Sequence, residues 1–231
     1  MMHESFVAEY LKLRGREGRL YPDEIVRCLP YPGRQAQHGT EWAIRARTAR
    51  RLRRYFAQRT PLRLLEVGCG NGWLSHYLSL LPACEVMGID INSVELRQGE
   101  RLFKAPNLSF RETTLAQLNA DSFDCILFAA SFQYFADVAH TLSECFQRLV
   151  RGGSVHIVDT HFYRTHERAA AQNRSASYFA GQGATSMERY YFHHSMEDLA
   201  PNRYRLLNPL SDGLRRLSGP VFPWIQIERP A

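Results

Sequence analysis

Several common signals are missing from this chain of 231 residues. It contains no apolar run of about 18 residues, so no transmembrane helix is predicted. Its first residues lack the basic and apolar regions of a signal peptide. The five cysteines are odd in number and show no Cys-x-x-Cys spacing, which argues against a disulfide framework and against a zinc site. We therefore expect a protein of the reducing cytoplasm without a bound metal.

Lysine is also scarce. Lys12 and Lys104 are the only lysines among 29 basic residues, and the formal net charge is +6. Seven arginines lie between Arg45 and Arg59, a concentration that can indicate a nucleic-acid surface. The apolar residues of this segment recur at helical spacing, which instead favours a core-facing helix with its arginines in solvent. These apolar residues are Trp42, Ala46, Ala49, Leu52 and Phe56.

The most informative segment is a glycine turn between a strand-like run and a helix-like run. Residues 62–67 are mostly apolar and include the acid Glu66, and a run suited to a helix begins at Trp73. Between them, glycines stand at alternate positions, namely Gly68, Gly70 and Gly72. Glycine permits positive φ and lets a ligand approach the backbone. The pattern therefore predicts a strand, a tight turn and a helix whose N-terminus faces a ligand.

A second acid lies at the distance that such a ligand site requires. Residues 84–90 form another apolar strand that ends in Asp90, 18 residues after Gly72. An acid about 20 residues beyond a glycine turn binds ribose hydroxyls in βαβ units. A dinucleotide fingerprint would need a third glycine where Trp73 stands, so a pyrophosphate ligand is disfavoured.

The rest of the chain alternates strand and helix patterns, which predicts an α/β fold with a parallel sheet. A first helix is expected over residues 4–13, a polar loop over 14–21 and the arginine-rich helix over 41–58. The expected strands are 62–67, 84–90, 107–111, 123–129 and 154–159, with helices at 73–81, 93–103 and 137–149. Residues 160–200 show no regular period, and 204–207 with 221–227 suggest an antiparallel edge pair. His156 alternates with apolar neighbours in its strand and is expected in the core.

Four landmarks together resemble the class I S-adenosylmethionine (SAM) methyltransferases. They are the glycine turn, Asp90, the Asp121–Leu127 entry to a strand, and Leu149–Ser154 with its two glycines. Gly18–Tyr21 and Glu41-Trp42 also resemble segments of bacterial methyltransferases. The resemblance implies a Rossmann-like, doubly wound, seven-stranded sheet that is mostly parallel with an antiparallel edge strand. It also implies one domain with an N-terminal helical lid (1–40), a SAM-binding core (41–160), a substrate cap (161–200) and C-terminal edge strands (201–231).

The resemblance also implies which residues bind SAM. They are Glu66, Gly68, Cys69, Gly70, Asn71, Gly72, Asp90, Ile91, Thr114, Leu115 and Ala129. Adenine is expected at Thr114, at the neighbouring backbone or at Glu112, because the aspartate of many relatives is replaced by Thr114. We expect Arg19 and Tyr21, from the polar loop, to close over the cofactor.

The acceptor is expected beyond the ends of the fourth and fifth strands. His161 is the preferred general base because histidine titrates near neutral pH, although a loop histidine without a catalytic role is an alternative. Tyr134 is the second catalytic candidate, and Gln133, Tyr163, Tyr191 and His194 are substrate candidates. The adjacent His193 and His194 would point apart in a strand, which disfavours a metal site.

Together, the candidate cofactor and acceptor residues predict a SAM-dependent methyltransferase that acts on a small molecule or biosynthetic intermediate, with methylation at oxygen favoured. RNA or protein methylation and a non-catalytic SAM-binding protein remain alternatives. The oligomeric state is left open. A Lys-Asp-Lys-Glu tetrad for methylation of ribose hydroxyls cannot be built from two lysines.

Overall fold

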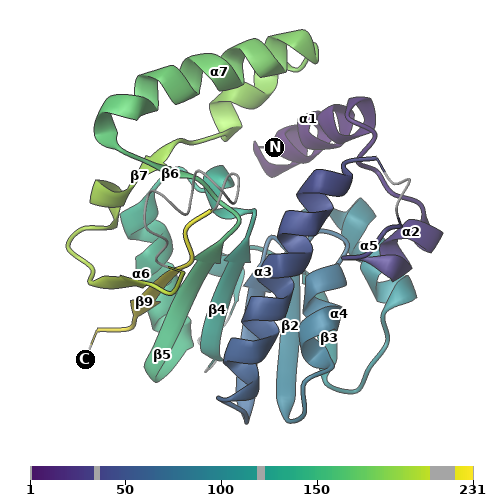
Figure 1. Ribbon diagram of the computed structural model, residues 1–231, viewed down its shortest axis with the longest axis vertical. Coiled ribbons are helices and arrows are strands. Elements are labelled where there is room, and N and C mark those ends of the chain that lie inside the picture. Colours follow the sequence, from purple (N-terminus) through teal and green to yellow (C-terminus); the bar gives the residue numbers. More distant parts are fainter. Residues whose placement is uncertain (1, 34–36, 119–122, 209–221, 231) are drawn as a thin grey trace.

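A computed structural model describes residues 2–33, 37–118, 123–208 and 222–230. Its centre is a seven-stranded sheet in the order β3-β2-β1-β4-β5-β9-β8 (Figure 1). The strands are β1 (Leu62–Val67), β2 (Cys84–Asp90), β3 (Leu108–Glu112), β4 (Phe123–Ala129), β5 (Leu149–Val158), β8 (Tyr204–Leu206) and β9 (Ile225–Glu228). Strands β1 to β5 pair in parallel, whereas β9 pairs antiparallel with both β5 and β8. The predicted fold class is confirmed.

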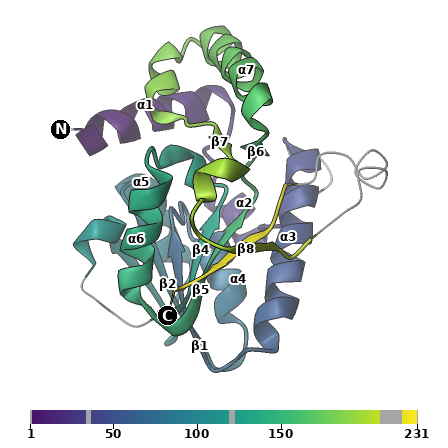
Figure 2. The same cartoon turned by 90° about the vertical axis from the view of Figure 1, so that its left-hand side faces the viewer.

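Helices cover both faces of the sheet. They are α1 (Met2–Arg16), α2 (Asp23–Cys28), α3 (Gly39–Ala57), α4 (Trp73–Ser79), α5 (Ser93–Leu102), α6 (Val138–Arg148) and α7 (Arg168–Gly181). Figure 2 shows α3 and α6 on opposite sides of the sheet. The apolar stripe predicted for the arginine-rich helix is buried against β1, β2 and β4, which confirms its role in the core. Within the described residues, none of the helices combines the length and the apolar composition that a membrane crossing needs.

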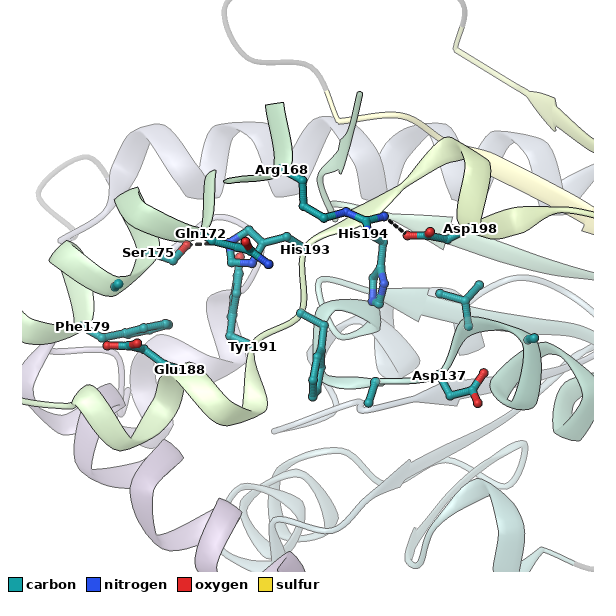
Figure 3. A pocket seen from close by; sticks show the side chains of 15 residues that line it. Asp137, Arg168, Gln172, Ser175, Phe179, Glu188, Tyr191, His193, His194 and Asp198 are labelled. Carbon is teal, nitrogen blue, oxygen red and sulfur yellow. Dashed lines mark hydrogen bonds and ion pairs between the residues drawn. The ribbon is translucent and has the colours of Figure 1, made fainter. Parts of the chain in front are cut away.

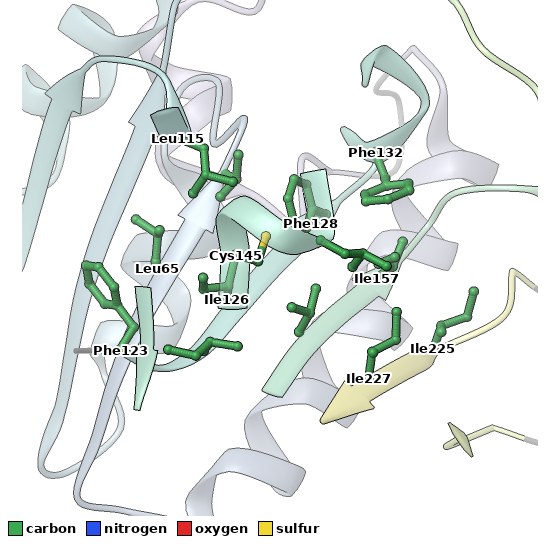
Figure 4. Packing of buried hydrophobic residues seen from close by; sticks show 14 of the residues in the cluster. Leu65, Leu115, Phe123, Ile126, Phe128, Phe132, Cys145, Ile157, Ile225 and Ile227 are labelled. Atoms are coloured by element: carbon green, nitrogen blue, oxygen red, sulfur yellow. The ribbon is translucent and has the colours of Figure 1, made fainter. Parts of the chain in front are cut away.

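The second face of the sheet packs under α6. This helix begins at the N-cap Asp137, whose carboxylate accepts a hydrogen bond from the His140 N–H over 2.9 Å. Its buried side chains Val138, Leu142 and Cys145 follow helical spacing and contact β4 and β5. Figure 4 shows this cluster, in which Ile225 and Ile227 of β9 extend the core beyond β5. The hydrophobic cores on the two faces of the sheet fix the positions of the strand ends, where the site lies.

The C-terminal strands form the antiparallel edge pair that the sequence predicts. Strand β9 lies between β5 and β8, and its Ile225 and Ile227 are fully buried. Strand β8, which exposes Tyr204 and Arg205, forms the edge and pairs antiparallel with β9. Val221, the first residue of the expected strand, lies outside the described residues, as do Asp121 and Ser122.

His156 lies in the core, as predicted. It is 1% exposed and accepts a hydrogen bond from the Trp224 indole N–H through Nδ1 over 3.0 Å. Burial lowers its pKa to about 3, so the ring is neutral. Strand β5 begins earlier than the predicted 154–159 and contains an irregularity. Phe123 pairs with Leu149, but Cys125 pairs with Ser154, and Gly152 has a φ of 77°.

The region expected to be irregular, residues 160–200, contains the helix α7. It was missed because Ala171 and Phe179 are its only buried residues among those described, so no apolar period is visible. Its alanine content, which favours a helix, was the available signal. In both views α7 lies beside α1, above the sheet. The Arg16 guanidinium donates to the Gln182 carbonyl over 2.6 Å, which joins the two helices.

Two short strands complete this cap. Strand β6 (Phe162–Tyr163) pairs in parallel with β7 (His194–Ser195). Between α7 and β7, the short helix η4 (Thr185–Tyr190) contacts α1. The N-terminal helix and the cap therefore form one layer over the sheet, although they are far apart in the sequence.

Candidate functional site

The three glycines of the turn all have positive φ, at 73°, 55° and 72°, but for different reasons. A Cβ on Gly68 would lie 2.6 Å from the Ser131 Cβ. A Cβ on Gly72 would lie 2.3 Å from the Phe110 ring. At Gly70 the nearest atom is a Glu95 carboxylate oxygen, 3.7 Å away. Gly68 and Gly72 are therefore needed for packing, whereas Gly70 keeps the space above the turn open.

That space is a cavity of about 90 Å³. Glu66, Gly68, Cys69, Gly70, Asn71 and Ala129 line it, together with Arg19 and Tyr21 of the N-terminal segment. These are eight of the residues predicted to bind the cofactor. Because β1 and β4 are adjacent, their carboxyl ends and the turn meet at one edge of the sheet, where ligands of open α/β sheets bind.

Asp90 is hydrogen-bonded to the backbone of the glycine turn. Its Oδ2 accepts a hydrogen bond from the Gly70 N–H over 2.7 Å, and its Oδ1 accepts one from the Asn92 N–H over 2.8 Å. It does not line the cavity itself. The Ile91 backbone N–H also interacts with this carboxylate. Burial raises its pKa.

Two further acids face the cavity. Glu66 is 3% exposed and accepts a hydrogen bond from the Ser75 hydroxyl, and burial raises its pKa to about 8. Glu95 accepts a hydrogen bond from the Asn92 amide over 2.7 Å, and burial raises its pKa to about 7. The positive charges of Arg14 and Arg45 oppose the effect of burial on the pKa of Glu95.

The cavity roof comes from α1 and the segment that follows it. Tyr10 and Arg14, one turn apart on α1, line the cavity, and the Arg14 guanidinium lies 5.0 Å from the Tyr10 ring centroid. Arg19 forms ion pairs with Glu17 and Glu41. The Tyr21 hydroxyl accepts a hydrogen bond from the Trp42 indole over 3.0 Å. Arginine and tyrosine side chains of the predicted lid therefore cover the glycine turn.

Tyr134 stands beside this cavity at the end of β4. Its ring centroid lies 5.8 Å from that of Tyr10 and 5.9 Å from that of Tyr191, in edge-to-face contacts. Burial raises the pKa of its hydroxyl. Behind Tyr191 lies a second, larger cavity of about 780 Å³, between α7, the start of α6 and residues 188–198 (Figure 3). We call this space the outer cavity.

The structure separates the remaining predicted site residues. Tyr191 and His194 line the outer cavity, whereas Gln133 and Tyr163 line neither cavity. Gln133 is held beside the ends of β4 and β5, because its amide donates to the Ala130 carbonyl and its Oε1 accepts from the Thr160 hydroxyl. His161 is exposed and lines neither cavity; its ring contacts Phe222, with centroids 4.5 Å apart.

The residues expected near adenine also lie outside the cavity. The Thr114 hydroxyl donates to the Gln117 side chain over 3.1 Å at the start of a short helix. Leu115 is part of the core under α6. Gly72 and Ile91 complete the set of predicted cofactor residues that do not line the cavity. The predicted residues of the glycine turn thus line one cavity, whereas the residues predicted to bind adenine lie outside it.

Several lining residues were not predicted. Tyr10, Arg14, Glu41, Trp42, Arg45, Trp73, Leu74, Glu95, Ala130 and Asp159 also border the cavity. The sequence pattern was sufficient to predict Glu95, because this residue lies in the first turn of the helix after Asp90. That turn faces the sheet edge at which Asp90 lies. Asp159 follows β5 with a φ of 52° and accepts a hydrogen bond from the Thr48 hydroxyl over 2.7 Å. No sequence pattern indicates Tyr10 and Arg14 of α1 as lining residues, because the position of α1 depends on a long-range contact.

Comparison with protein families agrees with this geometry. Residues 65–157 match the family model described as "Methyltransferase domain". A malonyl-[acyl-carrier protein] O-methyltransferase of Bacillus cereus is 26% identical over 100 residues, which are 42% of this chain and 37% of that protein. A protein of the same name from Bacillus anthracis is 24% identical over 54% of this chain and 51% of its own length. The chain thus spans between about a third and half of these relatives.

Solved structures share the fold. Magnesium protoporphyrin IX methyltransferase from Synechocystis PCC 6803, with bound SAH, superposes with a TM-score of 0.60 at 14% identity, over 89% of this chain and 93% of that one. The plantazolicin methyltransferase in complex with SAH gives a TM-score of 0.55 at 14% identity, over 97% of this chain and 100% of that one. Residues 65–157 thus match the methyltransferase domain that the sequence predicts, and the chain shares the fold of these solved structures.

Proposed function

We propose that this protein transfers the methyl group of SAM to an oxygen atom of a small-molecule acceptor. The observation that carries the proposal is Gly70, whose missing side chain opens the cavity above the turn while Asp90 holds its backbone N–H. A turn that needed glycine only for packing would leave no such opening. The family match supports the same reaction.

The charges around the cavity fit SAM. The ribose hydroxyls would donate to the carboxylate of Asp90, which has acceptor capacity for more than its backbone partners. Glu66 and Glu95 would face the positive charge of the ligand, and a nearby cation favours their ionised forms. Arg14 and Arg45 line the cavity, and a ligand carboxylate would compete for them with their ion-pair partners Glu17 and Glu41. When bound, SAM supplies a methyl group on a positively charged sulfur, which makes it a good leaving group.

The lid must move for this ligand to enter. A pocket for a drug-sized ligand usually has about 300–1,000 Å³. The cavity has about 90 Å³, since side chains of α1 fill much of the space above the turn. Withdrawal of Tyr10 and Arg14 would enlarge it, and their return would then exclude water from the reacting atoms and align them. The roof is therefore proposed to be a lid.

An oxygen acceptor is supported by the names of the curated relatives, which are O-methyltransferases. A hydroxyl acceptor must lose a proton, and Asp159 is a carboxylate at the cavity with a pKa raised by burial. Asp159 is better placed than His161 to receive that proton, because Asp159 lines the cavity and His161 does not.

Calorimetry tests the cofactor. S-adenosylhomocysteine should bind with micromolar affinity, whereas NAD should give no signal. Binding of NAD without binding of S-adenosylhomocysteine would refute the proposal. The acceptor can then be sought by incubating the protein with SAM carrying an isotope-labelled methyl group and a small-molecule extract. The carbon chemical shift of the labelled product separates O-methyl from N-, S- and C-methyl groups.

A further inference from the structure

The outer cavity lies one layer of aromatic rings away from the cavity at the glycine turn. Tyr191 lines the outer cavity, and its ring contacts Tyr134. Tyr134 in turn contacts Tyr10, which lines the inner cavity. Three tyrosine rings in contact therefore connect the linings of the two cavities. With about 780 Å³, the outer cavity has the volume expected of a pocket for an organic ligand.

Its positive charge is neutralised within the protein. Arg168, the only arginine or lysine that lines the cavity among the described residues, forms an ion pair with Asp198 and donates to the Ser195 hydroxyl over 2.7 Å. Figure 3 shows this pair on one side of the cavity. An acidic ligand would have to compete with Asp198 for that guanidinium.

Two acids of the lining have no such partner. Within the described part of the chain, Asp137 and Glu188 form no ion pair. They come from opposite sides of the cavity in Figure 3. The Asp137 charge is partly offset, since this residue caps α6. Glu188 is exposed and adds a negative charge at one side of the cavity.

The two histidines of the lining do not restore a positive charge. The side chain of His193 shares a hydrogen bond of 2.8 Å with the Ser175 hydroxyl, and His194 donates through Nε2 to the Phe132 carbonyl over 3.3 Å. Burial lowers the pKa of both rings, which are therefore neutral at pH 7. Neutral imidazoles offer hydrogen bonds without charge, while Phe179 and Phe192 add apolar walls.

We propose that the outer cavity binds the body of the methyl acceptor, and that this acceptor is an uncharged or cationic, partly aromatic molecule rather than an acid. The inference rests on the proposed function for the link to methyl transfer, but the binding preference is a property of the cavity alone. The reacting end would pass between Tyr134 and Tyr191 toward the glycine turn.

Two fluorescent probes that share the same ring system test the preference for an uncharged over an acidic ligand. N-phenyl-1-naphthylamine is neutral, and 8-anilinonaphthalene-1-sulfonate adds only a sulfonate. The neutral probe should bind with increased fluorescence and at least about tenfold more tightly than the sulfonate, because like charges oppose each other at the site. Equal or tighter binding of the sulfonate would overturn the proposal, as would the absence of binding by the neutral probe.

Variants on one helix locate the binding. Ala176 lines the cavity on α7, whereas Ala180 is exposed on the same helix and does not line it. Ala176→Trp should abolish binding of the neutral probe, and Ala180→Trp should leave it unchanged; equal affinities in the two variants would refute the location. Glu188→Lys should strengthen sulfonate binding, and no change would refute the charge argument.

The same samples separate this inference from the proposed function. Calorimetry with S-adenosylhomocysteine reports on the inner cavity only, and Ala176→Trp should leave that affinity intact. If S-adenosylhomocysteine binds but the neutral probe does not, the outer-cavity inference fails alone. If the probe binds as expected but S-adenosylhomocysteine does not, the proposed function fails.

Discussion

The backbone N–H of Gly70 donates a hydrogen bond of 2.7 Å to the carboxylate of Asp90, 20 residues further along the chain. The acid at the end of β2 therefore shapes the glycine turn at the end of β1, because both strands end at the same edge of the sheet. A change at Asp90 affects the turn as well as any ligand above it.

Replacement of Asp90 tests this coupling. Asp90→Ala leaves the N–H groups of Gly70 and Asn92 without their acceptor, at a cost of about 1–3 kcal/mol for each group that stays buried. Affinity for S-adenosylhomocysteine should fall at least about tenfold, because two ribose hydroxyls also lose their partner. Asp90→Asn keeps one oxygen and should lie between wild type and Asp90→Ala. Calorimetry and thermal unfolding measure both effects, and an unchanged dissociation constant would remove Asp90 from the site.

Two glycine variants should separate binding from stability. Gly70→Val points a branched side chain into the cavity, where only Glu95 lies near the first carbon, so binding of S-adenosylhomocysteine should be lost. Gly72→Ala places a carbon against the Phe110 ring and should lower stability by about 1–3 kcal/mol through overpacking. Circular dichroism melts and calorimetry distinguish the outcomes. A Gly70→Val protein that folds and binds normally would contradict the role of this glycine.

The buried acid Glu66 predicts a pH dependence of stability. Burial raises its pKa from 4.5 to about 8, so in this interval the folded state holds a proton that the unfolded state has lost. Its contribution to the free energy of unfolding therefore falls as the pH rises through about 8. Buried histidines with lowered pKa values have the opposite slope, but only below their usual value of 6.5.

Urea unfolding between about pH 7 and 9 checks this sign, since the histidines contribute little there. Wild type should lose stability as the pH rises, and Glu66→Gln, which cannot titrate, should lose less. Glu95, whose pKa burial raises to about 7, adds to the lower part of the window. Parallel curves for the two proteins would show that Glu66 is ionised in the folded state.

The proposed lid should respond to the cofactor. Tyr10 and Arg14 line the cavity from α1, and Arg19 and Tyr21 line it from the following segment. Hydrogen exchange should slow in residues 14–21, as well as in the glycine turn, when S-adenosylhomocysteine is added. The exposed edge strand β8 serves as an internal control and should not change. Protection confined to the glycine turn would make the N-terminal segment a fixed structural element.

Local patterns in the sequence determined the central fold and half of the site. The strand patterns, the alternate glycines and the spacing of Asp90 act over short distances, and each places its residues at one sheet edge. The helical stripe from Trp42 to Phe56 likewise identified its buried face. The resemblance to methyltransferases followed from the same residues, because the turn and the acid are consecutive parts of one βαβ unit.

Tertiary structure decided what covers that edge. Tyr10 and Arg14 reach the cavity only because α1 packs against the cap, more than 150 residues away in sequence, through contacts such as Arg16 with Gln182. The placement of His161 against Phe222, and of His193 and His194 at the outer cavity, depends on the same packing of the cap. Such contacts join residues that share no periodicity or spacing in the sequence, so the sequence pattern does not predict them.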